Sequence, residues 1–314
     1  MYPAVADNVP GWAAKPWAIL MSSFKEALFV DADVLFFTNP EVMFDDPAYE
    51  ETGALFFKDR NLGREKKRQW IRKVLPKPIS RQVQDVRMWT GESGHVQDSG
   101  LLVIDKWRHF VSLLLTARLN GIDRDGNAAY GTRGVYDMVY GDKETFWLSW
   151  EMAGVSDYAF HTGATGIIGG LNGSVPTASS ISPSAPDDEI ATSLARKLDY
   201  LTLDPITGEP KTRPQNYTVC SPQLLHYSTS GKPLWLNGWL SADKFAHPDE
   251  LDAGAFQVHV KEPEVKDKGV EPWELKENNN CCLTADSVEK VTKEDKEILE
   301  MLIDIAKDVE WDIP

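Results

Sequence analysis

Two aspartates interrupt the most apolar stretch of this 314-residue chain. Residues Ala27–Phe37 read ALFVDADVLFF, and a continuous apolar run of this kind is typical of a strand at the centre of a parallel or mixed sheet. Charged groups inside such a run carry a desolvation cost, so Asp31 and Asp33 need a specific reason to be there. The stretch therefore predicts a sheet with a pair of carboxylates on one of its inner strands.

Strand-like and helix-like segments alternate along the rest of the chain, which predicts an α/β architecture. We expect strands at Ala54–Phe57, Ser99–Asp105 and Leu224–Tyr227, and helices at Pro16–Lys25, Lys106–Asn120, Lys143–Gly154 and Glu289–Lys307. The glycine-rich segment Gly163–Gly173 predicts a loop or tight turn, and the Pro/Ser-rich segment Ser174–Asp188 a linker-like insertion. We expect one catalytic domain over residues 1–260 and an acidic C-terminal extension with an amphipathic helix over residues 261–314.

The charge of the chain excludes one class of partner and favours a metal site. A formal net charge of −15 argues against nucleic acid, because phosphate backbones are bound by Lys and Arg. The segment from Lys261 to Pro314 alone carries 16 Asp and Glu against 8 Lys and Arg. An anionic ligand would therefore need a cation and a few local Lys or Arg side chains to offset the field of the protein.

The three cysteines and two glycosylation sequons bear on the compartment. Cys220 could pair with Cys281 or with Cys282, three unpaired thiols are the alternative, and no spacing matches a zinc site. The sequons at Asn172 and Asn216 are compatible with the secretory pathway. The sequence has no run of 18 or more apolar residues, so we expect any membrane anchor to lie upstream of Met1.

The Asp31-Ala32-Asp33 triplet is the first candidate site. Residues i and i+2 of a strand point to one face, and two adjacent carboxylates repel each other unless a cation lies between them. Oxygen ligands suit Mn²⁺ or Mg²⁺, which can also bind a diphosphate. The alternative is a turn at the end of the strand, with the two acids solvated.

The segment from His226 to Trp235 is the second candidate site. His226 follows a short apolar strand and can complete a metal site with Asp31 and Asp33. Gly231 allows backbone amides to approach a phosphate, and Lys232 adds a cation. For His226 alone, a hydrogen-bonded core histidine is the alternative.

Asp98 and Asp142 are candidate catalytic acids. Each lies where a loop meets a predicted strand or helix, near the edge of an α/β sheet at which ligands commonly bind. The alternatives are a turn residue for Asp98 and a helix N-cap for Asp142.

Four segments in this order resemble the fungal Golgi α-mannosyltransferases of glycosyltransferase family 71, the α-1,3-mannosyltransferase group. The matching stretches are KPWAILMSSFKEALFVDADVLFFTNPE from Lys15, HVQDSGLLVIDK from His95, YGDKETFWLSWEMAG from Tyr140 and LLHYSTSGKPLWLNGWL from Leu224. The D-x-D and H-x-x-x-x-G-K-P pieces also look like those of glycogenin-type enzymes, which supports the fold more than the donor.

The resemblance implies a single-domain fold of the glycosyltransferase A type, GDP-mannose as donor, Mn²⁺ as metal with Mg²⁺ as the alternative, and a mannan or glycoprotein glycan as acceptor. It implies transfer with retention in the Golgi lumen by a protein with a membrane anchor. Carried over by position, Asp31 would contact the ribose or the metal, Asp33 and His226 the metal, and Lys232 the diphosphate. Asp98 and Asp142 would line the sugar and acceptor site.

Only 30 residues precede Asp31, about one βαβ unit at most, so we expect the first nucleotide-binding strands of the family to be missing here. Two alternatives to the mannosyltransferase remain: a UDP-sugar transferase of the same fold, and an inactive sugar-binding fragment. A metal-dependent hydrolase is less favoured, because no water-activating pair stands out beyond the D-x-D.

Overall fold

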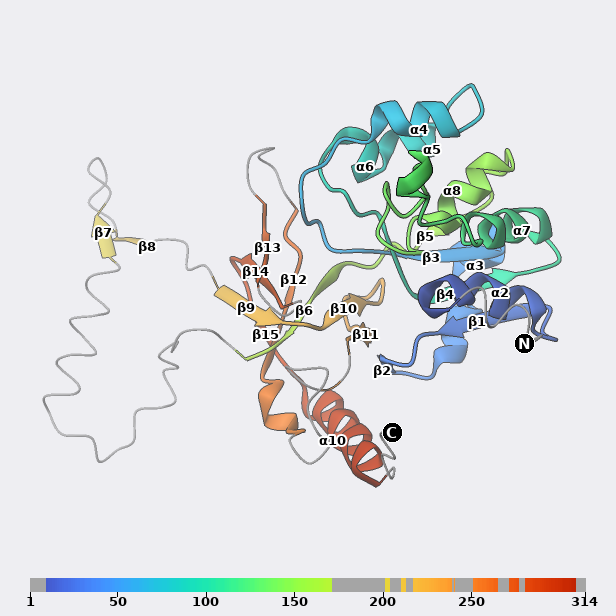
Figure 1. Cartoon of the computed structure of the whole chain (residues 1–314). Coiled ribbons are helices and arrows are strands. Elements are labelled where there is room, and N and C mark those ends of the chain that lie inside the picture. The colour runs from blue at the N-terminus through green and yellow to red at the C-terminus, as the bar shows by residue number, and fades with distance from the viewer. Residues whose placement is uncertain are drawn as a thin grey trace, which may run out of the picture.

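The protein is a mixed α/β structure, described by a computed structural model (Figure 1). The structure describes residues 10–170, 201–203, 210–212, 217–238, 240, 251–264, 271–276 and 280–308. The helices are α2 (Ala14–Met21), α3 (Pro47–Thr52), α4 (Arg68–Val74), α5 (Arg81–Asp85), α6 (Arg87–Thr90), α7 (Phe110–Leu119), α8 (Thr145–Met152) and α10 (Lys293–Asp308). The strands are β1 (Glu26–Val30), β2 (Val34–Phe36), β3 (Ala54–Lys58), β4 (Gln97–Asp105), β5 (Ala159–Phe160), β6 (Thr165–Gly169), β7 (Leu201–Leu203), β8 (Pro210–Thr212), β9 (Tyr217–Ser221), β10 (Leu224–Tyr227), β11 (Pro233–Asn237), β12 (Val258–Lys261), β13 (Trp273–Leu275), β14 (Cys281–Ala285) and β15 (Glu289–Lys290).

A four-stranded sheet forms the first half of the fold, in the order β1-β4-β3-β5. β4 pairs antiparallel with β1 and β3, β3 pairs parallel with β5, and every residue of β4 except Asp105 is buried. Helix α8 is buried nearly all round, as expected for a helix that is apolar on every side. Its side chains Phe146 and Trp150 pack with Phe56 and Ile104 of the sheet in the largest core cluster.

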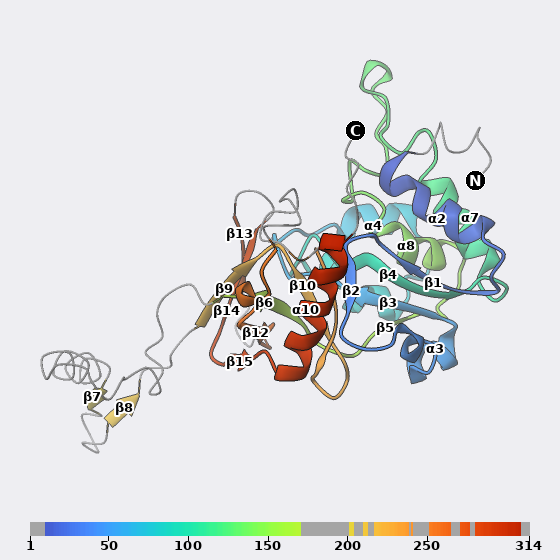
Figure 2. The same cartoon turned by 90° about the horizontal axis from the view of Figure 1, so that it is seen from below.

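A six-stranded sheet forms the second half, in the order β15-β12-β6-β10-β11-β2. Helix α10 covers this sheet, and Figure 2 shows it along the strands. Its residues Leu299 and Ile303 are spaced by four and pack against Leu225 and Leu236 in a separate core cluster. The predicted amphipathic C-terminal helix is confirmed, although it begins at Lys293 because Glu289 and Lys290 pair with β12 instead.

The predicted single strand over Ala27–Phe37 is wrong. β1 ends at Val30, β2 begins at Val34, and the two strands belong to different sheets. The amide of Val34 donates to the carbonyl of Asp31 at 3.1 Å, which closes a tight turn around the two aspartates. The turn takes the acids out of the buried run and lets the chain cross from one sheet to the other.

The prediction of a loop over Gly163–Gly173 is also wrong for residues 165–169, which form the buried strand β6 between β10 and β12. A Cβ on Gly166 would lie 2.1 Å from the carbonyl oxygen of Val260, so glycine is required here by close backbone approach rather than by a turn. The predicted linker over Ser174–Asp188 lies outside the described residues.

The cysteines form one of the two predicted pairs. Cys220 of β9 is disulfide-bonded to Cys282 of β14, and these strands are neighbours in a three-stranded sheet with β13. Cys281 is a buried free thiol. Among the described residues, no helix has the length and apolar character needed to cross a membrane.

Candidate active site at the junction of the two sheets

The Asp31–Asp33 turn is held in place from both sheets. The amide of Asp31 donates to the carbonyl of Gly100 in β4 at 2.9 Å. The carbonyl of Asp33 accepts from the amide of Gly238, just after β11, at 3.0 Å. Both aspartates are partly exposed, so their carboxylates lie at the surface of the junction.

Lys15 of α2 binds the first aspartate of this turn. Its Nζ donates to Asp31 Oδ2 at 2.7 Å and to Ser99 Oγ at 3.1 Å, and it lies 3.5 Å from Asp142 Oδ2. Lys15 is only 8% exposed. The sequence contained Lys15 in a matched stretch, but no spacing rule distinguished it from other lysines.

Burial is the largest influence on the pKa values of Asp31 and Asp142, the two acids beside Lys15. Burial raises the pKa of Asp31 to about 6, although the ammonium of Lys15 opposes the shift. Burial also raises the pKa of Asp142, again against the pull of Lys15. Within the described chain, Asp142 Oδ2 is a buried oxygen with no hydrogen-bond donor. The structure therefore brings the predicted residues Asp31 and Asp142 together around one cation.

Three consecutive charged residues, Asp142–Glu144, each contact a different partner. Asp142 faces Lys15, Lys143 Nζ lies 2.6 Å from Asp59 Oδ2, and Glu144 accepts from the indole of Trp147 at 2.5 Å. Burial raises the pKa of Glu144 to about 7. The N-cap alternative for Asp142 is wrong, because its carbonyl and not its carboxylate accepts from Thr145, and Glu144 is the N-cap residue of α8.

Asp98 is fully buried and joins the two sheets. Its Oδ2 lies 3.0 Å from His226 Nε2, and its Oδ1 accepts from Asn237 Nδ2 at 2.9 Å and from the amide of Gly100 at 3.0 Å. Burial raises the pKa of Asp98, but the His226 hydrogen bond and the charge of Lys143 outweigh burial and hold it below the usual range. The turn alternative for Asp98 is wrong, since the residue lies in β4.

His226 is engaged on several sides. Besides its contact with Asp98, its ring stacks on Trp235 with 3.9 Å between centroids and 14° between planes, and Phe57 meets it edge-on. Burial lowers the pKa of His226, which favours the neutral ring. The surroundings are those of a hydrogen-bonded core histidine.

A bulge in β4 gives Asp98 its orientation. Leu55 of β3 pairs with Val103, but Phe57 pairs with Asp98, so the register shifts between these positions. Such bulges re-aim side chains, and here the carboxylate points toward β10 and β11. A Cβ on Gly100 would lie 2.6 Å from Asn237 Nδ2, so glycine permits the close packing of the two sheets.

We expect Gly100→Ala to lower the free energy of unfolding by about 1–3 kcal/mol, because the added methyl group must displace Asn237 from Asp98. Urea denaturation checks this. Gly170→Ala is the matched control, since its Cβ would meet nothing closer than 3.7 Å, and it should change stability by less than about 0.5 kcal/mol. Equal stability of the two variants would contradict the role assigned to Gly100.

Gly231 and Lys232 lie in the turn between β10 and β11. Gly231 has a φ of +83°, which glycine adopts readily, and its amide donates to Ser228 within the turn. Lys232 is exposed. Asn237, beside the Asp31–Asp33 turn, is at the other end of β11, about 16 Å along the strand from Lys232. The structure does not bring this pair to the aspartates.

Among the described residues, the Asp31–Asp33 turn offers some but not all of the ligands of a divalent cation. No three His, Cys, Asp or Glu side chains among them are close enough to hold a metal ion. Asp31 and Asp33 could supply carboxylate oxygens from one turn, with the remaining positions filled by ligand and water. His226, as it stands, is committed to Asp98 and Trp235.

The amino-acid sequence is similar to those of known proteins. Residues 1–228 match the model of a protein family described as "Mannosyltransferase putative". The chain belongs to this family. The matched range includes Lys15, Asp31, Asp98, Asp142 and His226, and it confirms the resemblance to the fungal family seen in the sequence.

Relatives in two yeasts are similar over part of their length. The Candida albicans protein named "Putative alpha-1,3-mannosyltransferase MNN14" is 30% identical over 167 residues, which cover 49% of this chain and 23% of the relative. Saccharomyces cerevisiae "Alpha-1,3-mannosyltransferase MNT3" is 27% identical over 274 residues, 78% of this chain and 36% of the relative. "Alpha-1,3-mannosyltransferase MNT2" of the same yeast is 25% identical over 263 residues, 77% and 39% respectively. The chain thus spans well under half the length of these relatives.

Proposed function

We propose that this chain carries the transfer site of a retaining α-mannosyltransferase with a glycosyltransferase A-type fold. The donor is GDP-mannose, the acceptor is a mannose-containing glycan of a glycoprotein, and the bond formed is α-1,3. The observation that carries the proposal is the Asp31–Asp33 turn at the sheet junction, with Lys15 and Asp142 beside it. Membership of the family and the names of the related yeast proteins support mannosyl transfer and, with it, a location in the Golgi lumen.

The reaction breaks the bond between C1 of mannose and the diphosphate and joins C1 to an acceptor hydroxyl oxygen. Mn²⁺, or Mg²⁺ in its place, would be held by Asp31 and Asp33 and would offset the charge on the leaving diphosphate. Lys15 keeps the Asp31 carboxylate in position through its hydrogen bond.

Asp142 is the residue we place nearest the reacting sugar. Its Oδ2 is buried 3.5 Å from the ammonium of Lys15 and accepts no close hydrogen bond among the described residues, so we assign it to accept from a sugar hydroxyl or to stabilise positive charge at C1. Asp98 has its oxygens filled by His226, Asn237 and Gly100 and acts as a positioning residue.

The test is calorimetric binding of GDP with and without Mn²⁺, with UDP as the competing nucleotide. We expect Mn²⁺-dependent GDP binding, reduced about tenfold or more in Asp33→Ala because a carboxylate ligand is lost. Asp45→Ala, which changes an exposed acid between β2 and α3, is the control and should bind GDP normally.

Three outcomes would overturn parts of the proposal. Tighter binding of UDP than of GDP would point to a UDP-sugar transferase. GDP binding that ignores Mn²⁺ and Asp33 would remove the metal from the site. Binding of mannan without binding of any nucleotide would indicate an inactive sugar-binding protein.

A further inference from the structure

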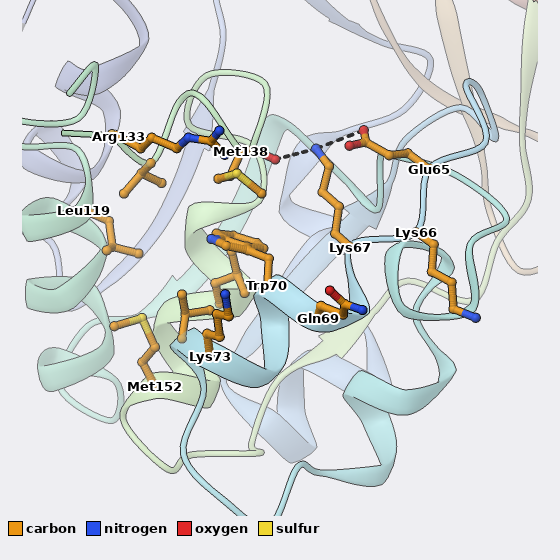
Figure 3. A pocket seen from close by; sticks show the side chains of 14 residues that line it. Glu65, Lys66, Lys67, Gln69, Trp70, Lys73, Leu119, Arg133, Met138 and Met152 are labelled. Atoms are coloured by element: carbon orange, nitrogen blue, oxygen red, sulfur yellow. Dashed lines mark hydrogen bonds and ion pairs between the residues drawn. The ribbon is translucent and has the colours of Figure 1, made fainter. Parts of the chain in front are cut away.

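A cavity of about 610 Å³ lies apart from the Asp31–Asp33 turn, between α4, α8 and the segment 133–138 (Figure 3). We call it the Trp70 cavity. Figure 3 shows the Trp70 indole among the side chains of Arg133, Lys73 and Leu119. Its volume suits a small ligand rather than an extended peptide.

Positive charge gathers in the Trp70 cavity, although the protein as a whole is strongly acidic at −15. Its lining includes Lys66, Lys67, Lys73 and Arg133, against the single acid Glu65. Lys67 is already used, because its Nζ donates to the carbonyl of Met138 and pairs with Glu65 at 3.1 Å. Within the described chain, the other three cations have no salt-bridge partner, so they are available to an anion.

The rest of the cavity wall is apolar. Trp70, Leu119, Met138, Leu148 and Met152 contribute to it, and Leu148 is buried in the core beneath. An indole presents a flat apolar face next to hydrogen-bonding groups, an arrangement that suits a sugar ring. Arg and Lys at the rim suit a phosphate group, which Arg can bind through two parallel hydrogen bonds.

A short segment of chain connects the Trp70 cavity to the candidate active site. Met138, whose carbonyl binds Lys67, is four residues before Asp142, and four residues span at most about 14 Å. Gly141 within this segment packs so closely on Trp12 that a Cβ would lie 2.9 Å from the indole. The segment is therefore fixed at both ends, which keeps the wall of the cavity within four residues of Asp142.

From this geometry we propose that the Trp70 cavity binds a phosphate-bearing sugar of the acceptor glycan. This inference rests on the proposed function, since it assigns a binding site for the acceptor of the same reaction. The sugar ring lies on Trp70, and the phosphate is bound by Lys73 and Arg133, with Lys66 nearby.

The experiment is calorimetric titration of the whole chain with mannose 6-phosphate, mannose and inorganic phosphate. Mannose 6-phosphate should bind at least about tenfold more tightly than either of the others, because each of them lacks one half of the interaction. The double variant Lys73→Ala/Arg133→Ala should lose about tenfold in affinity for mannose 6-phosphate. Both residues are exposed, so the variant should fold. Lys77→Ala, an exposed lysine outside the cavity lining, is the matched control.

GDP binding with Mn²⁺, measured on the same samples, separates this inference from the proposed function. Normal GDP binding with no preference for mannose 6-phosphate, or with no effect of the double variant, would overturn the inference and leave the function standing. Equal binding of inorganic phosphate and mannose 6-phosphate would also overturn it, because the sugar would contribute nothing. Mannose 6-phosphate binding without GDP binding would support the cavity as a sugar-phosphate site and remove its acceptor role.

Discussion

Asp98→Ala should lower the free energy of unfolding by about 3–5 kcal/mol, because it breaks a buried polar pair and leaves the partner groups without an acceptor. His226 Nε2 and Asn237 Nδ2 both lose their contact with the carboxylate, and the His226 side chain, at 2% exposure, has no room to turn toward water. Chemical denaturation monitored by tryptophan fluorescence measures this change in the free energy of unfolding.

Two comparisons separate this loss from a general effect of removing an acid. Asp157→Ala removes an exposed carboxylate that pairs with Arg108 at 3.2 Å, and it should cost less than about 1 kcal/mol. The double variant Asp98→Leu/His226→Leu should be less destabilised than the single changes Asp98→Leu and His226→Leu combined, because the carboxylate and the imidazole are removed together and neither is left facing an apolar partner. Asn237 Nδ2 and the amide of Gly100 still lose their acceptor, so part of the loss should remain. If Asp98→Ala kept full stability but lost transfer activity, Asp98 would act on the substrate and not through His226.

The apolar pattern of the sequence predicted the buried strands well where local chemistry decides the structure. Ala54–Phe57, Ser99–Asp105 and Leu224–Tyr227 all became strands within two residues of the expected bounds. The turn at Asp31–Asp33 was predicted only as the alternative to a continuous strand, because two strands that lie in different sheets have the same apolar composition as one strand in a single sheet. β6 was missed because glycines that allow close approach of β12 look like glycines of a loop.

The candidate site was only partly predictable, because its contacts join distant parts of the chain. Lys15 meets Ser99 across 84 residues, and His226 meets Asp98 across 128. Asp31, Asp98, Asp142 and His226 were each identified by residue type and position. That His226 binds Asp98, and that Asp31 binds a lysine, follow from the bulge in β4 and from the placement of α2.

Lys15→Met should reduce kcat about 10²–10³-fold while also lowering stability by about 3 kcal/mol. Methionine keeps most of the volume of the side chain but removes the only cation that lies, among the described residues, within 4 Å of both Asp31 and Asp142. Asp31 is then no longer held in position, and Asp142 is a buried acid without a counter-charge. Steady-state kinetics and urea denaturation measure the two effects. Lys25→Met, at an exposed lysine with only surface pairs, is the control and should change neither by much.

The pH dependence of this stability loss identifies its cause. Burial raises the pKa of Asp142, and Lys15 opposes that shift, so the pKa should rise further in Lys15→Met. An acid whose pKa is raised in the folded state favours folding when protonated, and that contribution is lost as pH rises above its unfolded value. The deficit of Lys15→Met should therefore be larger at pH 8 than at pH 5.5. Adding Asp142→Asn should recover part of the stability and reduce this pH dependence, because the amide needs no counter-charge. The remaining pH dependence comes from Asp31, whose pKa Lys15 also holds down against burial. Activity should stay low, since Asp31 is still without Lys15 and the acid that we place nearest the sugar has been removed. A deficit that is equal at both pH values, and unchanged by Asp142→Asn, would show that Lys15 stabilises the fold by packing and not by its charge.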